Sequence, residues 1–126
     1  MSFDEKEIKV VDENILATIV FIGTLFVSLS LSYDKREKLK KNSGLFTNKQ
    51  AKRIAVTNRI IVVIIALFYF QIDRETIGIS REKNKDVSLL HAQAFIEFVA
   101  VITAIVALYI TVKSNNEIED IENPNI

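Results

Sequence analysis

The chain contains no cysteine, which excludes disulfides, thiolate metal sites and a cysteine nucleophile. It also has no glycine-rich phosphate-binding loop. Its one histidine, His91, has no second His, Asp or Glu at ligand spacing, so we expect no metal and no cofactor. Sixteen basic residues balance sixteen acidic ones, and this net charge of zero predicts no nucleic-acid partner.

Charge is missing from three long segments of the 126 residues. Residues 14–33 carry none, 54–72 carry only Arg59, and 89–112 carry only Glu97 as a formal charge. A helix in a soluble protein of this size shows a polar face to water, whereas a helix that crosses a bilayer needs about 20 mostly apolar residues. The sequence therefore predicts an all-α integral membrane protein whose three transmembrane helices pack as a small bundle.

Two other interpretations fit the sequence less well. A cleaved signal peptide needs a basic leader before a shorter apolar segment, but the residues ahead of the first segment are mainly acidic. A soluble bundle would need further helices around three apolar ones, and no part of the chain is left to supply them. We expect a single membrane domain over 1–126.

Basic residues near the spans predict the orientation. The segment 34–53 holds eight basic and two acidic residues, and 73–88 holds four of each. The N-terminal tail, 1–13, has two lysines among five acids, and the acidic tail, 113–126, has one lysine. Because basic segments stay in the cytoplasm, we expect the N-terminus outside the cell membrane and the C-terminus inside.

The second helix has a recognisable start. Thr47 and Gln50 have the spacing of a capping box, which predicts a helix that begins ahead of its apolar segment. Its first turns carry Lys49, Lys52 and Arg53, beside the basic loop. Clusters of four to eight bases next to a span are typical of binding to anionic lipid headgroups.

Glu97 is the main candidate for a function. By helical rise it lies about 12 Å in from Leu89, within the hydrocarbon. An intramembrane acid indicates either a proton or cation path, or a neutral acid that hydrogen-bonds across a packed interface. The polar neighbours expected at its depth are Thr24 on the first helix and Tyr69 on the second.

One face of the third helix predicts close helix packing. At 100° per residue this face contains Gln93, Glu97, Ala100, Ala104, Ala107 and Thr111. Small residues four apart allow two backbones to approach. The expected partner is a run of small residues on the first helix, namely Thr24, Ser28 and Ser32.

The polar pair Asn58 and Arg59 lies within the second segment. The long side chain of Arg59 reaches the headgroups from there. We expect no salt bridge between Arg59 and Glu97, because their depths differ by roughly 10 Å.

The sequence leaves three classes of function to compare: an enzyme, a pore and a structural or accessory protein. An enzyme is not expected, because Glu97 stands alone and catalysis by such a site needs several converging groups. In its number of spans and its orientation the chain resembles one class of phage holins, which implies an oligomeric pore, although those end in a basic tail. The preferred hypothesis is a structural or accessory membrane protein that packs with copies of itself or with a larger membrane partner.

Overall fold

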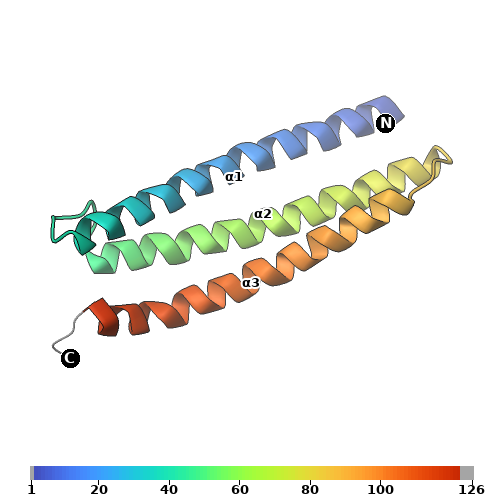
Figure 1. Ribbon diagram of the computed structural model, residues 1–126. Coiled ribbons are helices and arrows are strands. Elements are labelled where there is room, and N and C mark those ends of the chain that lie inside the picture. The colour runs from blue at the N-terminus through green and yellow to red at the C-terminus, as the bar shows by residue number, and fades with distance from the viewer. Residues whose placement is uncertain (1, 123–126) are drawn as a thin grey trace.

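The computed structural model describes residues 2–122 and the side chains of residues 2–113. Over that range the chain is helical, with α1 at Phe3–Leu39, α2 at Asn48–Glu82 and α3 at Ser88–Glu122 (Figure 1). All three helices are long and apolar enough to cross a membrane. The predicted fold class is confirmed.

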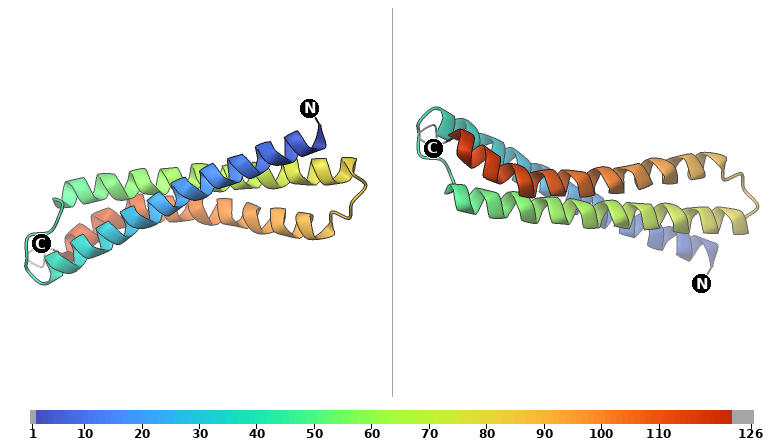
Figure 2. Two further views of the ribbon diagram at one scale, coloured as in Figure 1. Left: turned by 90° about the horizontal axis from the view of Figure 1, so that it is seen from above. Right: turned by 90° about the horizontal axis from the view of Figure 1, so that it is seen from below.

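The second helix lies between the other two. It runs antiparallel to both, and among the described residues no Cα of α1 lies within 8 Å of one in α3 (Figure 1). The two views of Figure 2 show α3 running alongside α2 while α1 crosses obliquely. The bundle is therefore held together through two faces of α2.

The face of α2 toward α3 contains the apolar core. Ala66 packs there with Val101 and Ala104, and partly buried side chains of α2 surround them. The ring centroids of Phe70 and Phe98 lie 5.9 Å apart at the same interface. Because Ala66 and Ala104 are small, the two backbones approach closely.

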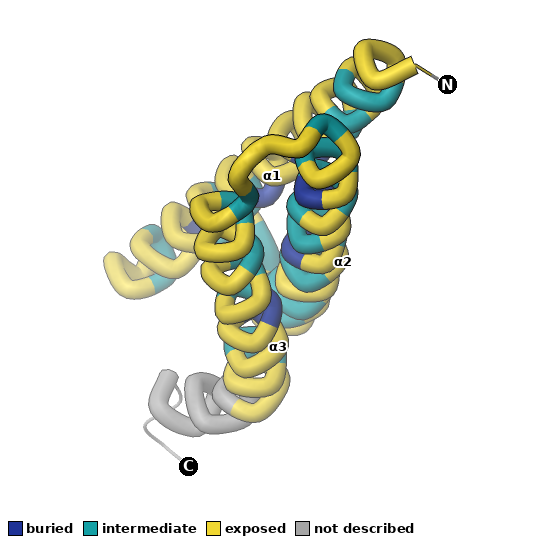
Figure 3. The backbone as a smooth tube through the Cα atoms, turned by 90° about the vertical axis from the view of Figure 1, so that its right-hand side faces the viewer, coloured by how far each residue is buried: buried dark blue, intermediate teal, exposed yellow. Residues whose placement is uncertain are grey.

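The sequence predicted that this face of α3 would pack on the small residues of α1, and that prediction was wrong. α2 lies between α3 and the small residues of α1, so Thr24 and Ser28 contact α2 instead. Asn58, which is buried, donates from Nδ2 to the Thr24 carbonyl oxygen at 3.2 Å and to the Ser28 hydroxyl at 3.1 Å. Figure 3 shows how few residues this packing buries.

Each helix begins at a side-chain cap. The capping box predicted at Thr47 and Gln50 is confirmed, with both reciprocal hydrogen bonds present. Ser2 and Glu5 form a second capping box at the start of α1. Asp86 accepts a hydrogen bond at 3.0 Å from the backbone N–H of the first residue of α3. This bond and one from the side chain of that residue lower the pKa of Asp86 below its ordinary value.

Ion pairs join α1 to α2 where the chain starts. Lys6 pairs with Glu82 at 3.1 Å, and Glu7 pairs with Lys83. The ammonium groups of Lys6 and Lys83 also lie 5.7 and 5.6 Å from the centroid of the Phe3 ring. These contacts keep the charged start of α1 helical and docked, so helices extend well past the apolar segments.

At the opposite end, Asp34 holds the α1–α2 connection. It is 2% exposed, it accepts a hydrogen bond from the Phe46 N–H at 2.8 Å, and it pairs with Lys38 at 2.8 Å. Burial by itself would raise the pKa of Asp34, but the bonds from Lys38 and Phe46 outweigh it and hold the pKa below its ordinary value. A Cβ at Gly44 would collide with the Asp34 carboxylate, so a larger residue there would displace that carboxylate from its bonds to Phe46 and Lys38.

The α2–α3 core generates the first prediction. Ala104 is 8% exposed and Ile102 is 47% exposed. We expect Ala104→Leu to lower the free energy of unfolding in mild detergent by about 1 to 3 kcal/mol, because added methylenes force the backbones apart. The matched change Ile102→Leu should leave it within about 0.5 kcal/mol, as surface substitutions do. Equal thermal stability of the two variants would contradict the packing described.

Candidate functional site: a polar cavity where the apolar layer ends

Contacts between helices define which residues lie level with one another. These contacts are Lys6–Glu82, Thr18–Tyr69, Phe70–Phe98 and Arg81–His91. Extending this alignment at a common helical rise brings Asn14, Asp73 and Glu97 to one level. Two observations agree: Asn14 and Asp73 line one cavity, and the Glu97 side chain lies near enough to Asp73 to interact with it electrostatically.

That level is where one end of the apolar part of the bundle lies. We call the residues from this level to the α1–α2 connection the apolar layer: 14–33 in α1, 54–72 in α2 and 97–112 in α3. With 20, 19 and 16 residues in the three helices, these segments span about 24 to 30 Å by helical rise, close to the thickness of the hydrocarbon of a bilayer. Beyond it, the first turns of α3 run beside the charged ends of α1 and α2.

Glu97 therefore lies at the edge of the apolar layer. The depth of about 12 Å expected for Glu97 was counted from Leu89, as if the membrane boundary lay where the apolar run of α3 begins. His91, two residues further on, bonds to the Arg81 guanidinium at 2.9 Å, so this turn of α3 faces a charged part of α2. The prediction that Thr24 would be a polar neighbour of Glu97 was also wrong. The Thr24 hydroxyl donates instead to the Phe21 carbonyl oxygen at 2.6 Å within α1.

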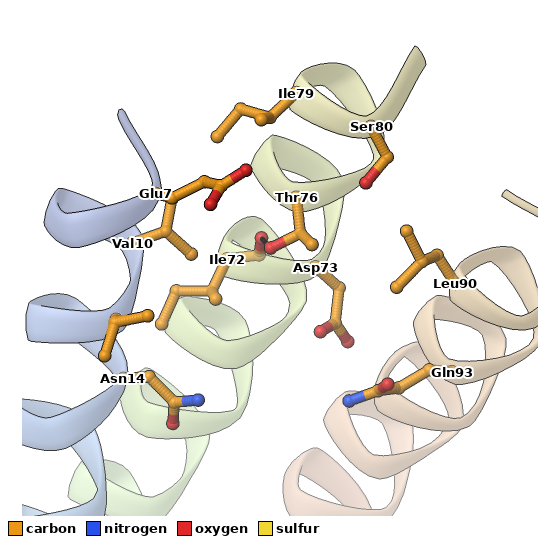
Figure 4. Close-up of a pocket in the computed structure, with 11 residues that line it drawn as sticks. Glu7, Val10, Asn14, Ile72, Asp73, Thr76, Ile79, Ser80, Leu90 and Gln93 are labelled. Atoms are coloured by element: carbon orange, nitrogen blue, oxygen red, sulfur yellow. Dashed lines mark hydrogen bonds between the residues drawn. The ribbon is translucent and has the colours of Figure 1, made fainter. Parts of the chain in front are cut away.

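A cavity of about 320 Å³ opens at this level among the three helices. Asn14 extends into it from α1, Asp73 from α2 and Gln93 from α3 (Figure 4). Apolar side chains complete the wall, together with Glu7, Thr76 and Ser80. One carboxylate oxygen of Asp73, Oδ2, is buried and has no hydrogen-bond partner. The cavity thus combines two carboxylates with two amides and two hydroxyls.

Its electrostatics are acidic. Glu97 is half-buried and lies near Asp73, so two carboxyl groups lie at the same part of the α2–α3 interface. Outside the apolar layer, the hydrogen bond and the charge from Lys83 lower the pKa of Glu7. Among the described residues there is no cluster of three or more potential metal ligands. The arrangement suits a proton, a monovalent cation or an ammonium group better than a divalent metal.

The other residues predicted from the sequence lie apart from this cavity. Asn58 and Thr24 are buried between α1 and α2, and Ser28 accepts a bond there. Ala100 and Ala107 are half-buried, on either side of Ala104. Arg59, Lys49 and Arg53 are exposed, and Lys52 is half-buried.

Asp73 is the residue that sequence reasoning missed. The sequence places Asp73 in the polar segment 73–88, because it directly follows the apolar segment 54–72. Its spacing nonetheless continues the side of α2 that faces α3, with intervals of four and three from Ala66 through Phe70 to Asp73 and Ile77. Such spacing is typical of a helix that continues to pack against an antiparallel neighbour.

Comparison with known proteins gave no match to a family model, to a curated protein or to a solved structure.

The facing carboxyl groups generate the second prediction. We expect Glu97→Lys to preserve thermal stability, because the introduced ammonium lies next to Asp73. In an Asp73→Asn background the same change should destabilise, and the double-mutant cycle should give a coupling of about 1 kcal/mol. Val99→Lys, on the exposed side of α3, is the control and should cost the same in both backgrounds. Equal effects of Glu97→Lys in both backgrounds would mean that the two groups do not face each other.

Proposed function

We propose that this chain is a small structural or accessory membrane protein that acts through transmembrane helix packing, with copies of itself or with a larger membrane partner. The observation that supports this most directly is the open arrangement of the bundle. Among the described residues α1 and α3 each pack on α2 and on no other helix. Each leaves a long apolar face for lipid or for another helix, and helix association in lipid depends on close contact between such faces. The role proposed is not enzymatic.

The orientation is part of the proposal. The basic residues at the α1–α2 connection favour the cytoplasmic side of the cell membrane, with the N-terminus outside. Exposed Lys49 and Arg53, with Lys52 beside them, would contact anionic lipid headgroups. At the other end, Lys6 and Lys83 form ion pairs with Glu82 and Glu7.

Single cysteines test the orientation, because the chain has none of its own. Ser43 and Lys85 are exposed and lie in the two opposite connections. A membrane-impermeant maleimide added to intact cells should label Lys85→Cys and leave Ser43→Cys unlabelled until the cells are opened. The reverse pattern would overturn the proposed orientation.

A conducting oligomer is the second candidate. The cavity with Asp73 and the nearby Glu97 favours it, since acids at membrane level are typical of ion and proton pathways. Within one chain, the α2–α3 interface beyond these acids is closed by the core at Ala66, Val101 and Ala104. A path would therefore have to run between copies.

One preparation distinguishes the two candidates. Purified in mild detergent, the protein should have the mass of two or more copies, or carry a stoichiometric partner. In liposomes it should show no cation or proton flux. A single protomer without a partner would contradict the packing role. Flux by the parent protein that is lost in a correctly folded Glu97→Gln variant would replace it with the conducting role.

A further inference from the structure

The cavity among the three helices is lined by acceptor groups and by no cation of its own. Neither a lysine nor an arginine is among the residues that line it. The Glu7 carboxylate is already paired with Lys83. Asp73 forms no ion pair among the described residues, and Glu97 places a second acid near it. The uncompensated carboxyl group of the cavity is therefore that of Asp73.

Asp73 also presents an unsatisfied acceptor. Its Oδ2 atom is buried and has no hydrogen-bond partner, an arrangement that is destabilising unless a donor fills it. Thr76, one turn further along α2, donates its hydroxyl hydrogen to the Ile72 carbonyl oxygen at 2.9 Å, so only its lone pairs remain for a ligand. Gln93 extends into the same space from α3 and adds a side-chain carbonyl oxygen (Figure 4). The polar side of the cavity thus needs a donor.

The rest of the wall suits carbon better than a bare ion. Val10, Ile79 and Leu90 line the cavity beyond the apolar layer, one from each helix. The volume of about 320 Å³ lies at the lower end of the range for small-molecule sites, about 300 to 1,000 Å³. The cavity therefore suits a cation that carries methylene groups.

The level of the cavity selects a ligand that resides in the membrane. It begins at Asn14 and Asp73, where the apolar layer ends, and extends along α2 as far as Ser80. This is the level at which the hydrocarbon of a bilayer gives way to headgroups. An amphiphile with a cationic head would place that head at the cavity while its tail stays in the hydrocarbon.

We propose that this cavity binds the primary ammonium group of a membrane amphiphile, either the ethanolamine headgroup of a phospholipid or an alkyl amine. A primary ammonium has three N–H donors and no acceptor, which matches a wall of acceptors. One N–H donates to Oδ2 of Asp73 in a charge-assisted hydrogen bond, and the others face the oxygens of Thr76 and Gln93. This inference adds a ligand to the proposed packing role and does not depend on it.

Lipid adducts on the full chain test the site. The protein, purified in mild detergent, is titrated with phosphatidylethanolamine or with phosphatidylcholine of the same acyl chains, and adducts are measured by native mass spectrometry. The two lipids share net charge, phosphate and tails, but the trimethylammonium of phosphatidylcholine has no N–H donor. The parent should bind one phosphatidylethanolamine per chain, at least about tenfold more tightly than phosphatidylcholine, because only the former satisfies Asp73.

Three variants locate the binding. Asp73→Asn should weaken binding of phosphatidylethanolamine roughly 10- to 100-fold, the range for loss of a hydrogen bond to a charged group. Glu75→Gln is the matched control, because it removes a carboxylate from the same helix outside the cavity, and it should bind as the parent does. Gln93→Leu, at an exposed position of α3, should weaken binding about 2- to 10-fold and provides the test if Asp73→Asn does not accumulate.

Competition identifies the source of the ammonium group. Octylamine carries the ammonium and a tail without a phosphate, and it should displace phosphatidylethanolamine from the parent. Octanol, which has the same tail and no charge, should not. Tighter binding of octylamine than of phosphatidylethanolamine assigns the site to a free amine, and the reverse order assigns it to the lipid.

Four outcomes would overturn the inference. Equal binding of the two lipids would mean that tails or phosphate are recognised instead of the ammonium. Unchanged binding in both Asp73→Asn and Gln93→Leu would place the lipid elsewhere. Displacement by Na⁺ or K⁺ but not by octylamine would assign the cavity to a metal cation, and the absence of any adduct would remove the site. The mass of the protein in mild detergent decides separately whether the packing role holds.

Discussion

Two-sided packing of α2 is the constraint on which the rest of the bundle depends. Lipid gives apolar helices no hydrophobic reason to associate, so contact must come from close van der Waals packing and hydrogen bonds. α2 uses both: Ala66 admits the backbone of α3, and Asn58 binds a carbonyl and a hydroxyl of α1. A polar bond of this kind contributes about 0.6 kcal/mol on average in membrane proteins. Among the described residues no Cα of α1 lies within 8 Å of one in α3, so loss of either face of α2 would detach a helix.

The alignment set by α2 also explains why a glutamate stands in the most apolar segment. Glu97 lies level with Asp73 and Asn14, where the uncharged part of the other two helices ends. A charged group costs far less at that level than at the bilayer midplane, because water and headgroups are within reach. The apolar run of α3 continues past this level because its first turns pack beside α2 rather than facing lipid on every side.

Much of the fold was predictable from the sequence, and the candidate site was not. Long uncharged segments predict spans because the bilayer excludes charge from each helix independently, and the Thr47 capping box is a local pattern within four residues. The depth of Glu97, its neighbour Asp73 and the partner of Ala104 depend instead on how one helix slides past another. Small residues on both the first and third helices were compatible with direct contact between them. Asn58 and Ala66 on the second decide the arrangement, and their partners can be read only from the packed structure.

The distribution of charge links topology to assembly. In a soluble protein, two copies of a helix can pack either parallel or antiparallel. An antiparallel arrangement then places the acidic end of one copy beside the basic end of the other. A membrane removes that freedom, because insertion fixes the same orientation for every copy. An α1 that is acidic at one end and basic at the other then repels its equivalent at both ends. The asymmetry that would direct insertion therefore also disfavours α1 of one copy as the parallel neighbour of α1 in another.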